Sequence, residues 1–239
     1  MKRLFLATIA LFIIAGLTFW VISKDPEIDT GGLDKFIRVS ELKKIMPAAQ
    51  AGDAEAQYKV GQIYAKGKDV KKDLHKAYEW YTKSADQGFG ASRYELGKMF
   101  ADGNGVRQNY YTAAKWYRLA ATFNNNANAQ FRLGELHFNG RGVEHDYGKA
   151  IQLYTKAASQ GHAAAQYLLA AMYEEGWGVP KDLITAYMWT KLSLPHRAEA
   201  MAVHKKYDPA KKLKDLLRKM NKYQTEEAER RLTALKKPR

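Results

Sequence analysis

The sequence predicts an all-α protein, in which a solenoid of helix hairpins follows one N-terminal transmembrane helix. Two observations predict the solenoid. A pattern of apolar and small residues occurs four times at a period of 36 or 37 residues, and within each copy the apolar residues recur at helical spacing. The third observation predicts the membrane helix, because residues 4–23 form a stretch of twenty residues without a charged side chain.

Residues 1–23 are expected to form an uncleaved transmembrane signal-anchor, since about twenty helical residues span the roughly 30 Å hydrocarbon core of a bilayer. Lys2 and Arg3 should stay in the cytoplasm. The chain would then be a single-pass protein of the bacterial inner membrane with a periplasmic C-terminal domain. The alternative is a cleaved signal peptide and a soluble periplasmic protein, although Ala15, the one acceptable cleavage site, lies within the apolar run.

Each copy of the repeat carries the same framework of aromatic and small residues. Tyr58, Gly61 and Tyr64 return as Tyr94, Gly97 and Phe100, then as Phe131, Gly134 and His137, and finally as Tyr167, Ala170 and Tyr173. In the second half, Trp80 and Tyr81 return as Trp116 and Tyr117, as Leu153 and Tyr154, and as Trp189 and Thr190. These stripes are expected to form the core, with His137 as a packing substitution.

The ends of the two helices in each copy are also marked. Glycine stands where the first helix must end and suits a left-handed C-terminal cap, at Gly67, Gly103, Gly140 and Gly176. Asp or Asn stands where the second helix begins and can accept its free N–H groups, at Asp73, Asn109, Asp146 and Asp182. The mid-helix glycine costs up to about 1 kcal/mol relative to alanine, so we expect close helix packing there.

With these positions the chain resembles the Sel1-like repeat family, relatives of the tetratricopeptide repeats. Repeat three reads ANAQFRLGELHFNGRGVEHDYGKAIQLYTKAASQG over residues 127–161 and follows the family pattern closely. The resemblance implies a superhelix of four repeats over residues 53–194, divided as 53–88, 89–124, 125–161 and 162–194. It also implies a non-enzymatic protein-binding module, either an envelope scaffold or adaptor, or an immunity protein that neutralises a secreted toxic effector such as a lipase.

Both ends of the repeat array need covering helices. Residues 24–52 are expected to be a linker and a capping helix over 35–51 that is interrupted or kinked at Pro47. Residues 195–239 should form basic C-terminal capping helices. Asp208 with Pro209 marks one helix start, and Thr225 followed by Glu226 marks a second.

Composition and motifs argue against catalysis. The chain has no Cys, which excludes disulfides, thiol nucleophiles and thiolate-bound zinc. Ser40 and Lys43 match the S-x-x-K motif of serine β-lactamases, but no K-T-G or S-D-N partner exists and Ser40 suits a helix N-cap. The six His form no metal-binding spacing. We therefore expect no catalytic residues, no metal and no cofactor, and the hydrolase remains a minor alternative.

A solenoid presents a concave face built from successive first helices, and partner contacts are expected where the copies differ. Phe138, Leu168 and Ala171 would provide an apolar centre among charges. The predicted partner-binding residues are Lys59, Gln62, Glu95, Lys98, Arg132, Glu135, Phe138, Leu168, Ala171 and Glu174. The partner would be an envelope component or a toxin.

The formal net charge of +14 is concentrated in the C-terminal residues 197–239. The simplest interpretation is a solvated helix face. Alternatively, Lys211, Lys212, Lys214 and Arg218 could contact anionic lipid headgroups, nucleic acid or an acidic protein. Nucleic acid is disfavoured, because the domain is expected outside the cytoplasm.

Overall fold

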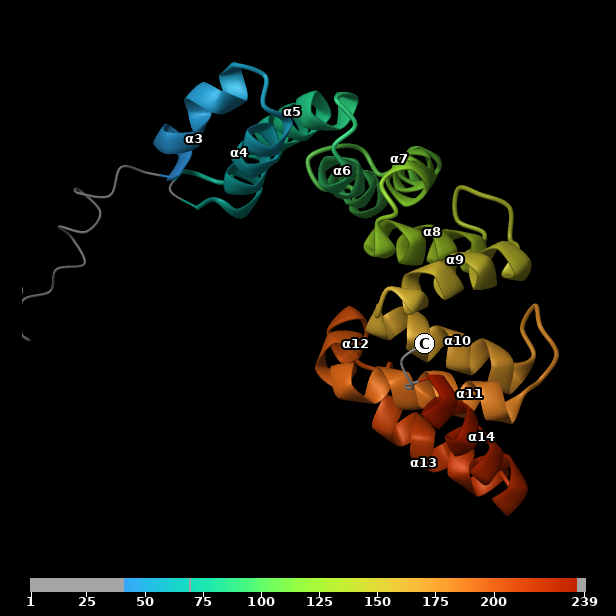
Figure 1. The fold of residues 1–239 in the computed structure, drawn as a ribbon. Coiled ribbons are helices and arrows are strands. Elements are labelled where there is room, and N and C mark those ends of the chain that lie inside the picture. The colour runs from blue at the N-terminus through green and yellow to red at the C-terminus, as the bar shows by residue number, and fades with distance from the viewer. Residues whose placement is uncertain (1–40, 69, 236–239) are drawn as a thin grey trace, which may run out of the picture. The chain divides into compact units, whose positions relative to one another are not determined.

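The computed structural model describes residues 41–68 and 70–235, in which all regular structure is helical (Figure 1). By its internal contacts the chain divides into Met1–Ile45 and Met46–Arg239. Of the first unit only residues 41–45 are described, at the start of α3 (Glu41–Gln50). The α3 helix runs through Pro47 without a break, so of the expected interruption or kink the interruption is wrong, and the kink stays a prediction. The remaining predictions for residues 1–40, including Ser40, fall outside the described residues.

Four helix hairpins form the repeat array, and each helix packs against the next along the chain (Figure 1). The first helices of the four hairpins are α4 (Ala54–Lys66), α6 (Gly90–Asp102), α8 (Ala127–Asn139) and α10 (Ala163–Glu175). The second helices are α5 (Leu74–Asp86), α7 (Tyr110–Phe123), α9 (Tyr147–Ser159) and α11 (Leu183–Ser193). The predicted all-α solenoid of hairpins is confirmed.

In every repeat the predicted caps are present at the end of the first helix and at the start of the second helix. The Asp73 carboxylate accepts a hydrogen bond from the backbone N–H of Lys76 at 2.9 Å, and Asn109, Asp146 and Asp182 cap their helices in the same way. Gly67 ends α4 in the left-handed region with a φ of 71°, and the other three glycines do the same. The turns of the array are therefore set by local side-chain chemistry.

The mid-helix glycine makes room for an aromatic ring from the second helix. A Cβ atom added at Gly97 would lie 2.4 Å from the Tyr117 ring, and Gly61 and Gly134 face the rings of Tyr81 and Tyr154 equally closely. These three rings are buried. Repeat four differs on both sides of the contact, because Ala170 replaces the glycine and Thr190 replaces the ring. The expected close packing is confirmed.

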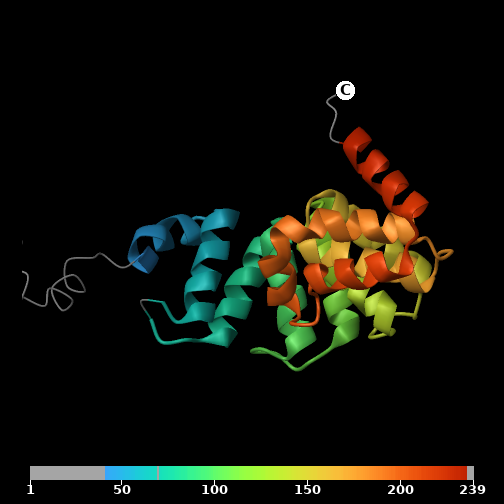
Figure 2. The ribbon, with the colours of Figure 1, turned by 90° about the horizontal axis from the view of Figure 1, so that it is seen from below.

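The C-terminal helices cover repeat four (Figure 2): α12 (Arg197–Val203) packs on α10, and both α13 (Pro209–Lys219) and α14 (Lys222–Leu235) pack on α11. A 3₁₀ turn (Leu194–His196) leads into α12. The predicted start at Asp208 and Pro209 is confirmed. The predicted start at Thr225 is wrong, because Asn221 and Gln224 exchange side-chain to backbone hydrogen bonds and begin α14 three residues earlier.

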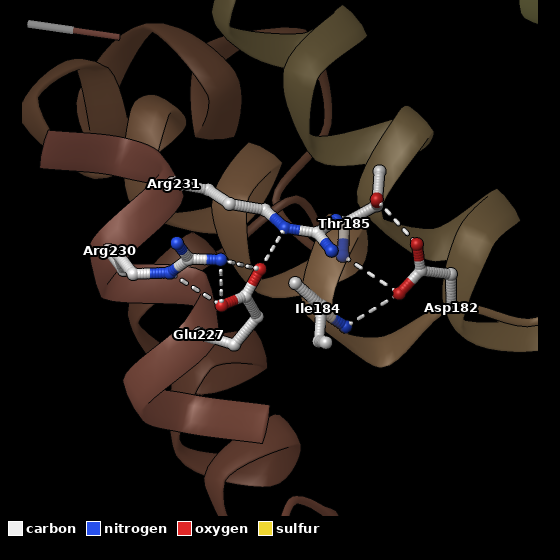
Figure 3. A network of polar contacts seen from close by, with 6 residues as sticks. All are labelled: Asp182, Ile184, Thr185, Glu227, Arg230 and Arg231. Atoms are coloured by element: carbon white, nitrogen blue, oxygen red, sulfur yellow. Dashed lines mark hydrogen bonds and ion pairs between the residues drawn. The ribbon is translucent and has the colours of Figure 1, made fainter. Parts of the chain in front are cut away.

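A polar cluster lies where α14 meets the start of α11 (Figure 3). Glu227 accepts hydrogen bonds from Arg230 and from Arg231, at 2.6–3.0 Å. Beside it, Asp182 accepts from the backbone N–H and hydroxyl of Thr185, which closes the first turn of α11. The Asp182 hydrogen bonds fix the start of α11, and the Glu227 hydrogen bonds join residues within α14. Burial raises the pKa of Asp182, but its hydrogen bonds at the start of α11 and, more weakly, the Arg231 charge outweigh burial and leave the pKa lowered.

In the described part of the chain, no helix combines the length and the apolar character that a membrane crossing requires. This finding contradicts the expected placement as a single-pass protein of the inner membrane. The stretch 4–23 that prompted the expectation lies outside the residues that the structure describes.

Candidate functional site

Eight of the predicted contact residues occupy two equivalent positions on the first helices, one turn apart. The first position holds Lys59, Glu95, Arg132 and Leu168, and the second holds Gln62, Lys98, Glu135 and Ala171. Residues three apart on a helix share a face. We call this set of eight residues the first-helix strip.

In repeats two and three the strip residues pair within their own helix. The Lys98 ammonium lies 3.0 Å from the Glu95 carboxylate, and the Arg132 guanidinium lies 2.8 Å from that of Glu135. The Lys98 side chain is 39% exposed and the Glu135 side chain 23%, so these pairs are partly withdrawn from water without being enclosed. They present polar groups that are fixed in position, which suits recognition of another surface.

Repeat one continues the strip with a different pairing. Gln62 donates a hydrogen bond to the Tyr58 hydroxyl at 2.7 Å, and Lys59 lies 2.7 Å from the Glu55 carboxylate. The Tyr58 ring is packed against Phe89, at 5.4 Å between ring centroids. The same two register positions therefore carry different hydrogen-bonding groups in successive repeats, on one common framework.

A hollow of about 200 Å³ opens between α6 and α8. Strip residues Lys98, Arg132 and Glu135 line it, together with Asp102 and Arg141. Burial raises the pKa of Glu135, although Arg132 opposes this effect. For Lys98, burial lowers the pKa, but the Glu95 carboxylate outweighs burial and leaves it raised. Lys98 and Arg132 therefore carry their positive charges in a hollow that is partly withdrawn from water.

In repeat four the chain's own C-terminal segment covers the corresponding surface. The Tyr207 ring stacks on Tyr167 with centroids 5.1 Å apart, and the Tyr167 hydroxyl donates to the Lys206 carbonyl at 3.0 Å. Leu168, Val203 and Tyr207 pack against one apolar cluster that contains Phe131 and Tyr154. The apolar end of the strip is therefore partly occupied by the protein itself.

Two further predicted contact residues have internal partners. The Glu174 side chain is only 7% exposed and lies between two ammonium groups of α13, 2.6 Å from Lys212 and 2.5 Å from Lys219. Phe138 packs against the rings of Tyr147 and Trp177. Glu174 is thus unavailable to a partner, and Phe138 is partly buried against other parts of the fold.

The structural role of Glu174 was not predicted from the sequence. Burial raises the pKa of Glu174, but hydrogen bonds from Lys212 and Lys219 outweigh it and leave the pKa lowered. Thirty-eight residues separate Glu174 from Lys212. No local pattern could have indicated the contact, because it depends on how α13 folds back onto repeat four.

The basic residues of the tail do not act as one set. Lys211 and Arg218 line a hollow of about 840 Å³, whereas Lys212 is held by Glu174 and Lys214 is not among the lining residues. Arg218 lies 3.5 Å from the Asp215 carboxylate. Of the four cations that the sequence singled out, Lys211, Lys214 and Arg218 are exposed, and Lys212 is held by Glu174.

Two of the six histidines have structural roles. His137 is buried, as predicted, and its Nδ1 lies 3.1 Å from the Glu144 carbonyl. His162 caps α10, because its Nδ1 accepts from the Ala165 N–H at 3.2 Å, and its ring stacks on Phe131 at 4.4 Å. Within residues 41–68 and 70–235 there is no cluster of His, Asp and Glu that could hold a metal ion.

Comparison with known proteins gives a consistent family signal. The model of the Sel1 repeat matches residues 54–89, 90–122, 127–162 and 163–193, more than half of the chain. A Sel1-like repeat-containing protein of Acanthamoeba polyphaga mimivirus is 55% identical over 40 residues, which cover 17% of this chain and 7% of the viral protein.

Two solved structures are similar at 33% identity. One is c5321, a protective antigen of uropathogenic Escherichia coli strains, with a TM-score of 0.64 over 65% of this chain and 33% of the antigen. The other is a Sel1 repeat protein from Oxalobacter formigenes, with a TM-score of 0.61 over 66% of this chain and 65% of that one. The chain thus spans about a third of the antigen and less than a tenth of the viral protein.

Proposed function

Because the chain belongs to the Sel1 repeat family, we propose that it is a protein-interaction module that binds a partner protein on its first-helix strip and has no catalytic activity of its own. The fold is typical of protein–protein interaction. Stacked repeats offer an extended surface of equivalent positions, on which each copy can carry a different side chain.

One observation supports the choice of surface above others. In repeats one to three the glycine and ring positions of the framework keep their chemistry, as the pairs Gly61 with Tyr81 and Gly97 with Tyr117 illustrate. The strip positions between them change from cation to anion to apolar residue. In repeats one to three, packing explains the constant positions but places no demand on the changing ones, so recognition of a partner is the function that we assign to the strip there. In repeat four, Leu168 packs against the apolar cluster that the C-terminal segment also contacts.

The test is an affinity pull-down from native extract with the intact chain and two charge-reversal variants. Lys98→Glu with Arg132→Glu changes the strip. Lys115→Glu with Arg118→Glu makes the same change in net charge on exposed residues of α7. We expect the strip variant to lose a stoichiometric partner by roughly tenfold or more, and the α7 variant to keep it. Equal retention by both variants would refute the assignment.

The nature of the captured partner separates two roles that the family resemblance suggests. An envelope component would make the protein a scaffold or adaptor, and a toxic effector would make it an immunity protein. The two roles differ further in a co-expression experiment. An immunity protein restores growth to cells that produce the effector, and the strip variant should fail to do so, whereas a scaffold gives no such protection.

A further inference from the structure

A second hollow, of about 840 Å³, lies between α10, the segment before α13, and α13 itself. Six cationic and three acidic side chains line it together with the Tyr167 ring. We call it the basic hollow. It is separate from the first-helix strip residues, and the proposed function makes no use of it.

Each carboxylate of the basic hollow already has a cationic partner. Glu174 is bound by Lys212 and Lys219, Asp215 lies 3.5 Å from Arg218, and Asp208 accepts two hydrogen bonds of 2.8 Å from Arg197. Lys205, Lys206 and Lys211 are exposed, and none of them has a carboxylate partner in the part of the chain that the structure describes. The hollow therefore offers three ammonium groups to an outside anion.

The surroundings of these lysines indicate which anion fits. The Tyr167 ring has Tyr207 stacked on it, and the Lys212 ammonium lies 5.2 Å from its centroid. The ring is therefore not free to stack on a nucleic-acid base, which is the usual source of affinity for single strands. Leu217, the exposed apolar residue of α13, lies on the side of the helix opposite the basic face, about 160° away. It therefore cannot insert into a bilayer alongside the lysines.

We propose that the basic hollow is a second binding site, which takes a carboxylate-rich segment of a partner protein. Lys205, Lys206 and Lys211 supply the cationic rim, and the Glu174 carboxylate holds Lys212 and Lys219 in place behind them. Three flexible ammonium groups around a hollow of this size suit several carboxylates along an extended peptide.

The test measures binding of a fluorescent hexaglutamate peptide to the full chain by anisotropy. The triple variant Lys205→Glu, Lys206→Glu, Lys211→Glu should weaken binding by roughly tenfold or more and flatten its salt dependence. Lys214→Glu is the control for α13, because Lys214 is exposed on the same helix outside the hollow, and it should bind within about twofold of the parent chain.

The same titrations distinguish this proposal from its competitors. Vesicles of phosphatidylglycerol or a single-stranded oligodeoxythymidine that bind more tightly than the peptide would overturn it, as would equal peptide binding by the triple variant and the parent. The strip variant Lys98→Glu with Arg132→Glu should bind the peptide normally. Failure of the strip assignment and failure of this proposal therefore give different results.

Discussion

At the scale of single residues, the contact between a mid-helix glycine and a buried ring holds each hairpin together. Repeat four shows how the pair can change, since buried Ala170 and Thr190 stand at the positions where the other repeats pair glycine with tyrosine. A methyl group and a hydroxyl-bearing side chain fit together where a methyl group and a ring would overlap. The residues at the two positions must therefore match each other, and a small residue at the first position is not enough by itself.

This pairing predicts the outcome of a double-mutant cycle. Gly97→Ala should lower the free energy of unfolding by about 1–3 kcal/mol, because the new Cβ would lie 2.4 Å from the Tyr117 ring. In the background of Tyr117→Thr, the same change should cost much less or become stabilising, since alanine favours helices. Urea denaturation of the four proteins measures the coupling, and additive costs would contradict this account.

His162 makes stability depend on pH at a single residue. Burial lowers the pKa of this imidazole to about 4, whereas an unfolded histidine titrates near 6.5. Between these values the unfolded chain binds the extra proton, so stability is complete above about pH 6.5 and falls as the pH decreases toward 4. The loss should be on the order of 3 kcal/mol.

Another repeat of the chain shows which substitution would keep this helix cap without a titrating group. Asn126 caps α8 at the position that His162 occupies in α10, through a hydrogen bond of 2.9 Å to the Ala129 N–H. His162→Asn should therefore keep the cap and reduce the fall in stability between pH 7 and pH 4.5. Unfolding curves at both values test this, and an unchanged pH dependence would remove His162 as its source.

At the scale of helices, the Glu174 carboxylate fastens α13 to α10. Glu174→Gln would leave Lys212, whose side chain is only 11% exposed, without its counter-charge. Loss of one partner of such a pair is destabilising, here by about 1–3 kcal/mol. Amide hydrogen exchange should show reduced protection in α13, whereas Glu175→Gln, an exposed neighbour, should leave protection unchanged. Equal protection in both variants would contradict the role of Glu174.

The helices also show what the sequence could and could not predict. The repeat period, the glycine caps and the Asp or Asn caps depend on residues close in sequence, and the structure confirms all of them. The start of α14 lies at the Asn221–Gln224 capping pair and not at Thr225, which the acidic residues after it had favoured. The Glu174 ion pairs and the Tyr167–Tyr207 stack join residues about forty apart, and no local spacing encodes them.

The candidate site was predictable to a similar degree. Register alone placed Lys98 and Arg132 on the same face of successive first helices, and both line the hollow between α6 and α8. Glu174 and Lys212 were both singled out as contacts for outside partners, but they bind each other. Sequence patterns give the position of a residue on its own helix, and only the packing of other helices decides whether that position stays accessible.

At the scale of the whole molecule, the repeats pack mainly on their neighbours, as expected for a solenoid. A defect in one repeat should therefore spread only to the adjacent ones. In Gly97→Ala, hydrogen exchange should accelerate in α6 and α7 and in the helices packed against them, with no change in α11 or α14. Uniform acceleration throughout the described helices would instead indicate a single cooperative unit.

The central claim is that a partner protein is bound by the first-helix strip, and site-specific photocrosslinking in living cells tests it most directly. A photoreactive amino acid is placed in turn at Gln62, Lys98 and Glu135 on the strip. The controls are Glu79, Lys115 and Gln152, which are exposed and equivalent to one another on the second helices. The account predicts that one and the same protein crosslinks from the strip positions and not from the controls. Crosslinking from the controls alone, or equally from both sets, would contradict it.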